Sequence, residues 1–199
     1  LTSIPHTLLI SAIGVMENAD EAVSMDFKGV GNAVYVVGTT QPELGGSEYF
    51  KAHGFVGNNV PKVNPQRARE LMNSLSTAME QGLIRACHDC SEGGLGVTIA
   101  EMAFASGLGA EIQLGAAPLG APIDRDDFIL FSESNSRFVV EVSRRHQKRF
   151  EEIMTGVSFA RIGRVTGSER LEVYGLNNSK IISVSLGELK DAWQKPLRW

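Results

Sequence analysis

Cysteine is scarce in this sequence, with two among 199 residues. The pair, Cys87 and Cys90, forms a C-x-x-C motif, and at the start of a helix such thiols can have a lowered pKa and redox activity. A structural zinc site would need two further ligands, and the four scattered histidines supply no obvious second half. Two interpretations stay open, a thiol–disulfide function and two free thiols in a reducing cytoplasm.

Long apolar runs, basic clusters and a basic leader are also missing. The apolar runs are far shorter than a membrane span, and a net charge of −4 without a Lys/Arg cluster argues against a general nucleic-acid binder. We therefore expect neither membrane nor nucleic acid as a partner. The N-terminal LTSIPHTLLIS has no basic stretch before its apolar run, unlike a signal peptide. Because the chain does not begin with Met, we expect a piece of a longer protein, with residues 1–7 as a linker from a missing domain.

The sequence contains alternating signals for strands and helices over its whole length. A chain of 199 residues is long enough to bury a core. The mixture predicts one α+β domain over residues 1–199, a layered mixed β-sheet flanked by helices. We expect strands at 8–16, 33–38, 110–114, 138–142, 159–165, 170–174 and 180–184, and helices at 47–55, 64–81, 144–155 and 185–193. The pair 159–165 and 170–174 is expected to form a hairpin.

Residues 85–112 predict a strand end, a polar glycine turn and an amphipathic helix. A serine in the turn, Ser91, can cap the free backbone N–H groups of the helix, and these groups with the helix dipole favour an anion. Adjacent glycines would let a ligand approach the backbone. An ordinary capped helix start is the alternative, since neither G-x-x-x-x-G-K-[ST] nor a G-x-G-x-x-G after a strand is present. The candidate residues of this turn are His88, Asp89, Ser91, Glu92, Gly93 and Gly94.

Three closely spaced aspartates, Asp124, Asp126 and Asp127, are candidate ligands of a metal ion. Acidic residues also suit the first turn of a helix, where they meet the positive end of its dipole. We therefore expect a short helix here.

Two further polar loops are candidates for a binding site, one before a predicted helix and the other before a predicted strand. In the alternative interpretation, both loops are ordinary turns exposed to solvent. Their candidate residues are Gly45, Gly46 and Ser47 in the first and Ser132, Glu133, Ser134 and Arg137 in the second.

Three motifs occur in order: ELGGSEYF (43–50), CHDCSEGGLGVTIAEMAFASGLGAEI (87–112) and LFSESNSRFVVEV (130–142). Together they resemble the C-terminal domain of the large synthetase subunit in the phosphoribosylformylglycinamidine synthase family, related to aminoimidazole ribonucleotide synthetase. The resemblance spans nearly the whole chain and implies that fold. Two positions depart from the family, because Cys90 stands where an aliphatic residue is usual and Glu92 where Asp is common. The cysteine disfavours a thiol–disulfide function, since a role shared by the family would not depend on it.

The resemblance implies an ATP-dependent amidoligase of purine biosynthesis, which converts formylglycinamide ribonucleotide to formylglycinamidine ribonucleotide. ATP and Mg²⁺ are its implied cofactors, and the cytoplasm is its implied location. The implied partners are the preceding synthetase domains, a glutaminase subunit and a small accessory subunit. The family's catalytic histidine and most of its ATP and magnesium contacts lie in the preceding domains, so we expect no catalytic residue here and no activity from this piece alone.

The resemblance also implies that the three polar loops border a second nucleotide pocket. Their residues would bind phosphate through backbone N–H groups, hydroxyls and the Arg137 guanidinium, while Asp89 or Glu92 could hold Mg²⁺ through water. A non-catalytic domain that packs the synthetase core and docks subunits is the alternative.

Overall fold

The computed structural model describes residues 9–16 and 18–197. Its strands are β1 (Ala33–Val37), β2 (Ile84–Asp89), β3 (Gly109–Gln113), β4 (Phe138–Val142), β5 (Phe159–Thr166), β6 (Arg170–Tyr174) and β7 (Lys180–Ser185). They form a seven-stranded sheet in the order β2-β4-β1-β5-β3-β6-β7. All neighbours pair antiparallel except β3 and β6, which are parallel. The predicted mixed sheet is confirmed.

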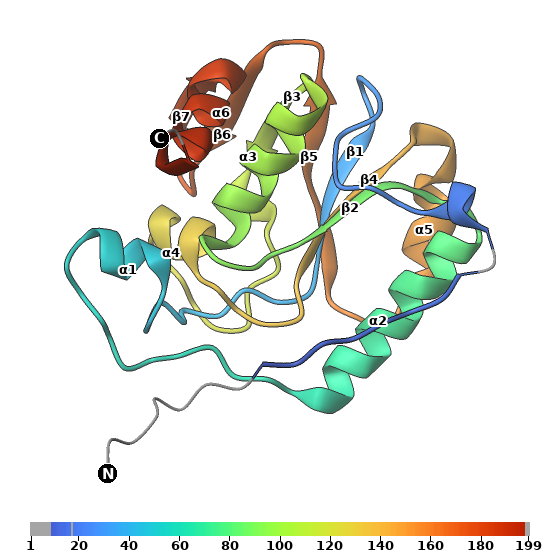
Figure 1. The fold of residues 1–199 in the computed structure, drawn as a ribbon, viewed down its shortest axis with the longest axis horizontal. Helices are drawn as coiled ribbons and strands as arrows, with labels where there is room; N and C mark the ends of the chain where they lie inside the picture. Colours follow the sequence, from blue (N-terminus) through green and yellow to red (C-terminus); the bar gives the residue numbers. More distant parts are fainter. Residues whose placement is uncertain (1–8, 17, 198–199) are drawn as a thin grey trace.

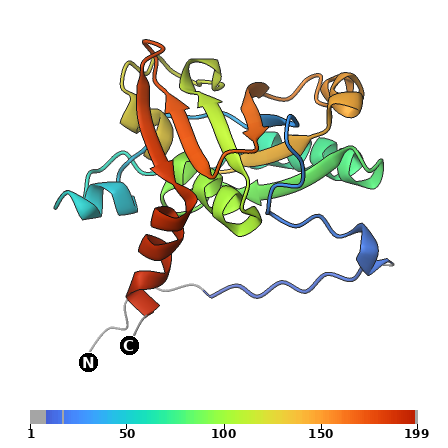
Figure 2. The same ribbon diagram turned by 90° about the horizontal axis from the view of Figure 1, so that it is seen from above.

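Helices cover both faces of this sheet (Figure 1 and Figure 2). The predicted start of the long helix is confirmed, because the Asn64 side chain accepts a hydrogen bond from Arg67 N at 3.1 Å and Pro65 takes the first helical position. None of the helices in the described residues has the length and apolar character needed to cross a bilayer. The helices are α1 (Glu48–Ala52), α2 (Pro65–Glu80), α3 (Gly94–Ser106), α4 (Asp126–Phe131), α5 (Gln147–Ile153) and α6 (Leu186–Gln194).

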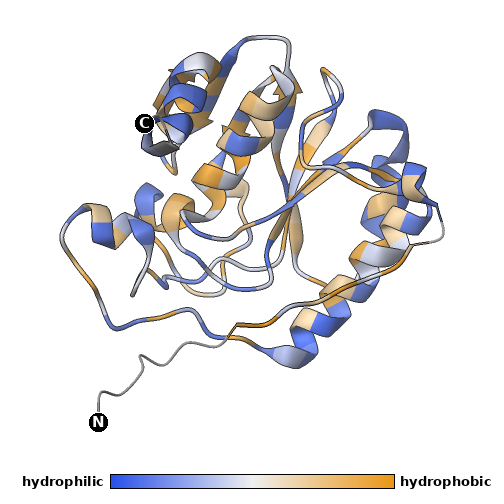
Figure 3. Ribbon diagram, viewed as in Figure 1, coloured by the Kyte–Doolittle hydropathy of each residue, from blue (hydrophilic) through white to orange (hydrophobic). Residues whose placement is uncertain are grey.

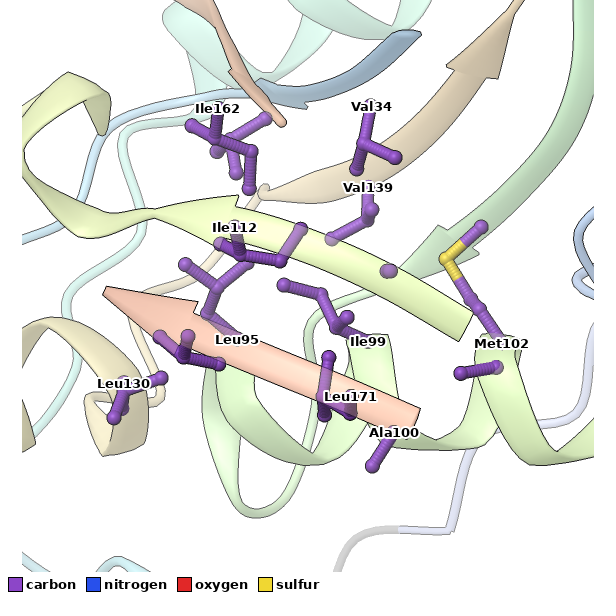
Figure 4. Close-up of a cluster of buried hydrophobic side chains, with 14 of the residues drawn as sticks. Val34, Leu95, Ile99, Ala100, Met102, Ile112, Leu130, Val139, Ile162 and Leu171 are labelled. Atoms are coloured by element: carbon purple, nitrogen blue, oxygen red, sulfur yellow. The ribbon is translucent and has the colours of Figure 1, made fainter. Parts of the chain in front are cut away.

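Two apolar cores lie on opposite faces of the sheet, because side chains alternate along each strand. Val34 and Val36 of β1 belong to the core beneath α3, whereas Tyr35 belongs to the core beneath α2 and α5. In the first core, Leu95 and Ile99 of α3 lie among side chains from several strands (Figure 4). Each such fully buried side chain contributes about 1.5–3 kcal/mol. These contacts fix the start of α3 at the end of β2.

A buried carboxylate on β4, Glu141, is a feature that the sequence did not predict. Glu141 is 0% exposed and accepts hydrogen bonds from Lys28 N at 2.6 Å, Gly29 N at 2.9 Å and Asn32 Nδ2 at 2.5 Å. These three donors replace the hydrogen bonds to water that the carboxylate loses when it is buried. The side chain therefore ties the turn before β1 to the sheet.

The predicted hairpin of residues 159–165 and 170–174 is wrong, because β3 lies between β5 and β6. The short turn at 166–169 would permit a hairpin, but both strands instead pair with β3 on its two sides. Gly109 at the start of β3 shows how tight this arrangement is, since an added Cβ would lie 2.2 Å from Ser168 O and 2.3 Å from Arg170 O. Local spacing cannot reveal a strand inserted from elsewhere in the sequence.

The predicted buried strand at residues 8–16 is also wrong within this chain. Residues 9–16 belong to no strand or helix, and all are exposed. Leu9 is 89%, Ile13 95% and Val15 98% exposed. Residue 8 and the expected linker 1–7 lie outside the described residues. This apolar stretch, whose sequence resembles a strand, therefore contributes to neither of the two described cores.

Candidate functional site

Three loops meet at the end of the sheet where β1 and β2 finish and β4 begins. They come together because β4 pairs antiparallel with both neighbours. Gln41 N, after β1, donates to Ser134 Oγ at 2.9 Å. The carboxylate of Glu133 accepts from Glu48 N at 3.0 Å and from Gly93 N at 2.8 Å. The turn before β4 thus touches both other loops, and the convergence that the pocket hypothesis required is observed.

A buried polar network stabilises the turn before β4. Arg137 is 1% exposed, and it donates from Nη1 to Thr40 Oγ1 at 2.8 Å, from Nε to Ser134 O at 3.2 Å and from Nη2 to Ser132 O. Ser132 Oγ donates to Gln41 O at 2.5 Å. Burial lowers the pKa of the Arg137 guanidinium. These polar groups bind one another and hold the loops in position.

The predicted N-cap role of Ser91 is wrong. The N-cap of α3 is Gly93, which has no side chain to cap with, and Ser91 Oγ instead donates to Asp89 Oδ2 at 2.5 Å. This hydrogen bond is the main reason that the pKa of Asp89 is lowered. The free Gly93 N–H is taken by the carboxylate of Glu133, a full negative charge at the positive end of the helix. An anion from the chain itself occupies the place predicted for a ligand anion.

The glycines of these loops also face the chain itself. A Cβ on Gly94 would lie 2.3 Å from Ser132 O, and one on Gly45 would lie 2.7 Å from Asn59 N. Gly46, with φ +74°, has open space beside it. The close approach to the backbone that was predicted for a ligand at Gly94 is made instead by the backbone of Ser132, and Gly45 is approached in the same way by Asn59.

Two cavities flank the turn before β4, and Asn135 and Ser136 line both. Ser136 has a φ of +57°, a strained conformation for serine. The first cavity, of about 430 Å³, has an acidic wall of Asp89, Glu92 and Glu133, with Ser91, Arg137, Pro61 and Met72 completing much of it. The second, of about 370 Å³, carries charges of both signs on Lys62, Arg67, Glu43 and Glu70.

The structure divides the predicted site residues into two groups. Asp89, Ser91, Glu92, Glu133 and Arg137 line the acidic cavity, and Ser134 lines the second one. Other predicted residues have structural contacts instead: Ser47 caps α1 by accepting from Phe50 N at 3.2 Å, and His88 Nε2 lies 2.8 Å from Glu101 Oε2. The predicted residues that line neither cavity are Gly45, Gly46, Ser47, His88, Gly93, Gly94 and Ser132.

The basic residues of the second cavity were not predicted from the sequence. Lys62 and Arg67 flank the start of α2, which Asn64 and Pro65 mark clearly in the sequence. The sequence feature that could have identified them is the presence of basic residues beside a recognisable helix start. A cavity of mixed charge next to an acidic one offers positions for both an anion and a cation.

No group of three or more His, Cys, Asp or Glu side chains in the described residues could hold a metal ion. Asp89 and Glu92 therefore do not build a complete metal site by themselves. Asp126 and Asp127 lie in the first turn of α4, as predicted. The carboxylate of Asp127 forms an ion pair with Arg125 at 2.6 Å and accepts from Tyr49 Oη at 2.9 Å, which lowers its pKa. The short helix predicted at these aspartates is observed.

Both cysteines are free thiols. Burial, with a smaller effect from Asp89, raises the pKa of Cys87 to about 12, and burial also raises the pKa of Cys90. A thiol–disulfide catalyst needs the opposite, a thiolate stabilised near neutral pH. The environment therefore disfavours that function.

We expect Cys87 in the folded chain to react with iodoacetamide at pH 8 about a thousandfold more slowly than in urea, because only the thiolate reacts. The raised pKa also predicts the direction of the pH effect on stability. The unfolded thiol loses its proton first, so the folded state binds more protons between about pH 9 and pH 12. The free energy of unfolding should be unaffected below pH 8 and fall as the pH rises through this window.

Peptide mass spectrometry after timed alkylation measures this reactivity. The Cys90→Ala variant isolates Cys87 and provides the matched control for the second thiol. Equal alkylation rates for folded and unfolded Cys87 at pH 8 would contradict the expectation.

The mixed sheet and the three converging loops define a class, the C-terminal domains related to aminoimidazole ribonucleotide (AIR) synthase. The family model described as AIR synthase related protein, C-terminal domain, matches residues 29–175. The chain belongs to this family.

Two curated relatives match almost the full chain. Phosphoribosylformylglycinamidine synthase subunit PurL of Alkaliphilus metalliredigens is 31% identical over 98% of this chain. The subunit of the same name from Moorella thermoacetica is 34% identical over 98% of this chain. In both cases the chain spans 26% of the length of the relative.

Solved structures show the same fold at lower identity. Thermotoga maritima PurLQS has a TM-score of 0.74 at 22% identity, covering 86% of this chain and 28% of that one. T. maritima PurL complexed with FGAR has a TM-score of 0.76 at 22% identity, covering 86% and 30%. E. coli HypE has a TM-score of 0.61 at 20% identity, covering 82% and 52%.

Proposed function

We propose that this chain is the single C-terminal domain of an ATP-dependent amidoligase that converts formylglycinamide ribonucleotide to formylglycinamidine ribonucleotide in purine biosynthesis. The proposal depends on one observation, the similarity of 98% of the chain to two PurL subunits at 31% and 34% identity. The domain contributes no catalytic residue. It acts only together with the preceding synthetase domains, and it is inactive alone.

ATP and Mg²⁺ are the proposed cofactors of the whole enzyme. T. maritima PurL has been solved complexed with ATP, with ADP and with AMPPCP, which supports nucleotide binding by this family. The structure called PurLQS supports assembly with other subunits, and we take a glutaminase subunit and a small accessory subunit as the partners. We propose a cytoplasmic location for the enzyme, with neither nucleic acid nor membrane as a partner, because its proposed substrates are small metabolites.

Within this domain, the acidic cavity is the proposed nucleotide-binding position. Asp89 and Glu92 would hold Mg²⁺ through water, and one or two carboxylates suffice when nucleotide phosphates supply the other ligands. The phosphate would compete with Glu133 for the N–H of Gly93. Ser91, which also lines the cavity, completes the proposed contacts, while the buried Arg137 would contribute its positive charge to the cavity wall. The remaining predicted residues would support these loops.

Calorimetric titration of the chain with MgADP tests this position. We expect binding heat for the parent chain and none for Glu92→Trp, because an indole on this exposed residue would fill the acidic cavity. Glu169→Trp is the matched control, since Glu169 is exposed in the turn after β5, at the opposite end of the sheet. The absence of heat at millimolar nucleotide, or equal heat for both variants, would reject the position.

The reaction itself needs the longer polypeptide. We expect that polypeptide to release phosphate from ATP in the presence of formylglycinamide ribonucleotide and ammonia, and the 199-residue chain to release none. A longer polypeptide that folds, binds ATP and formylglycinamide ribonucleotide, and still forms no formylglycinamidine ribonucleotide would overturn the proposed function.

A structural role is the second candidate, and a specific observation favours it. Ser132, Ser134 and Arg137 direct their polar groups at the chain itself, and Glu133 already occupies the N–H of Gly93. In this second proposal, the only role of the network is to hold the loops against the sheet. In that case the titration shows no nucleotide binding while the longer polypeptide remains active.

A further inference from the structure

An apolar arm, residues 9–16, precedes the folded body of the chain. Its sequence, LISAIGVM, contains no charged residue and has apolar side chains at both odd and even positions. A strand with apolar residues on both sides is typical of the interior of a sheet that is covered on both faces. An edge strand would normally carry charges or proline that prevent further pairing. The arm thus has the composition of an inner strand.

The arm is extended and belongs to no strand or helix. Every residue from 9 to 16 is exposed, and Ile10 is 76% exposed although isoleucine is usually buried. Figure 2 shows the arm standing away from the body, and Figure 3 shows that much of it is hydrophobic. Contiguous exposed apolar surface of this kind marks an interaction site.

In the described residues, the arm pairs with neither edge of the sheet. At the β2 edge, Cys87 N already donates to Ser24 O at 3.2 Å. The other edge strand, β7, lies on the far side of the molecule from the arm (Figure 1 and Figure 2). It also carries the charged Lys180, paired with Glu172 at 2.6 Å. Neither edge of the described sheet thus suits an uncharged inner strand as a partner.

We infer that residues 9–16 form a β-strand within a sheet of the polypeptide that precedes this domain. The inference rests on the proposed function, which places synthetase domains before this chain. The curated relatives provide the room for such a sheet, because this chain spans 26% of their length. Backbone hydrogen bonds would provide the pairing, and burial of Leu9, Ile13 and Val15 would provide much of the affinity. The arm is then a structural joint that fixes the orientation of this domain.

Hydrogen exchange, followed by mass spectrometry, tests the inference on the 199-residue chain and on the longer polypeptide. We expect amides 10–16 to exchange rapidly in the chain and at least about 100-fold more slowly in the longer polypeptide. Ile13→Lys should remove this protection. It should leave the melting temperature of the 199-residue chain unchanged, because Ile13 is 95% exposed there. Val30→Lys, at another exposed apolar residue outside the arm, is the matched control.

Rapid exchange of the arm in the longer polypeptide would overturn the inference. Protection that appears in the 199-residue chain and grows with concentration would also overturn it, because the partner would then be a second copy. Ligase activity is measured on the same samples. A protected arm in an inactive polypeptide supports the strand while rejecting the proposed function, and an active enzyme with an unprotected arm rejects the strand alone.

Discussion

Replacing Arg137 by methionine should lower the free energy of unfolding by about 4 kcal/mol. The guanidinium is 1% exposed and donates to Ser134 O, Thr40 Oγ1 and Ser132 O. Methionine fills much of the same space but donates nothing, so these buried acceptors would lose their partners. Urea denaturation followed by tryptophan fluorescence measures the loss. The turn before β4 should also lose hydrogen-exchange protection first.

Arg164→Met is the matched control, since its exposed guanidinium forms one ion pair, with Glu111 at 2.9 Å. An exposed pair contributes less than about 1 kcal/mol. Losses of similar size for the two variants would show that the network around Arg137 does not hold the site loops together.

Replacing Gly94 by alanine should cost about 3 kcal/mol, the second large effect. Gly94 has a φ of +60°, and an added Cβ would lie 2.3 Å from Ser132 O and 2.9 Å from Leu130 O. Both obstacles are backbone atoms, so a rotamer change cannot relieve the clash. Either α3 or the end of α4 must move. Thermal and urea unfolding of the variant measure the cost.

Gly107→Ala separates the backbone strain from the clash. Gly107 ends the same helix with a φ of +74°, but no heavy atom lies within 4 Å of its added Cβ. This variant should cost only the conformational penalty, about 1–2 kcal/mol. An equal cost at both positions would mean that the approach of Gly94 to α4 is not tight in solution.

Much of the secondary structure could be predicted from local sequence. The helices predicted from residues 64 and 185 are observed, with a cap at Asn64 and a capping box of Ser185 and Glu188. These features depend on residues within one turn of each other. The strand at 33–38 follows from an apolar run that the structure buries at every position of β1. Local propensity and burial agree at these places.

The candidate site was only partly predictable. The polar residues of the three loops were identified, and their convergence is observed. The sequence could not say that Glu133 would accept from Gly93 N, or that Arg137 would face the loop backbone. A polar residue has the same sequence signature whether its partner is a ligand or another loop. The ligand roles therefore remain predictions.

By itself, the sequence determined most of the elements, the caps at Asn64 and Ser185, and the three motifs that resemble one family of synthetases. Each depends on near neighbours in the chain or on the residues themselves. Only the tertiary structure decided that β3 would lie between β5 and β6, that Glu141 would bind the turn before β1, and that residues 9–16 would stand without a partner. The physical reason is that strand pairing and burial are set by distant segments, whose competition for one sheet leaves no trace in local spacing.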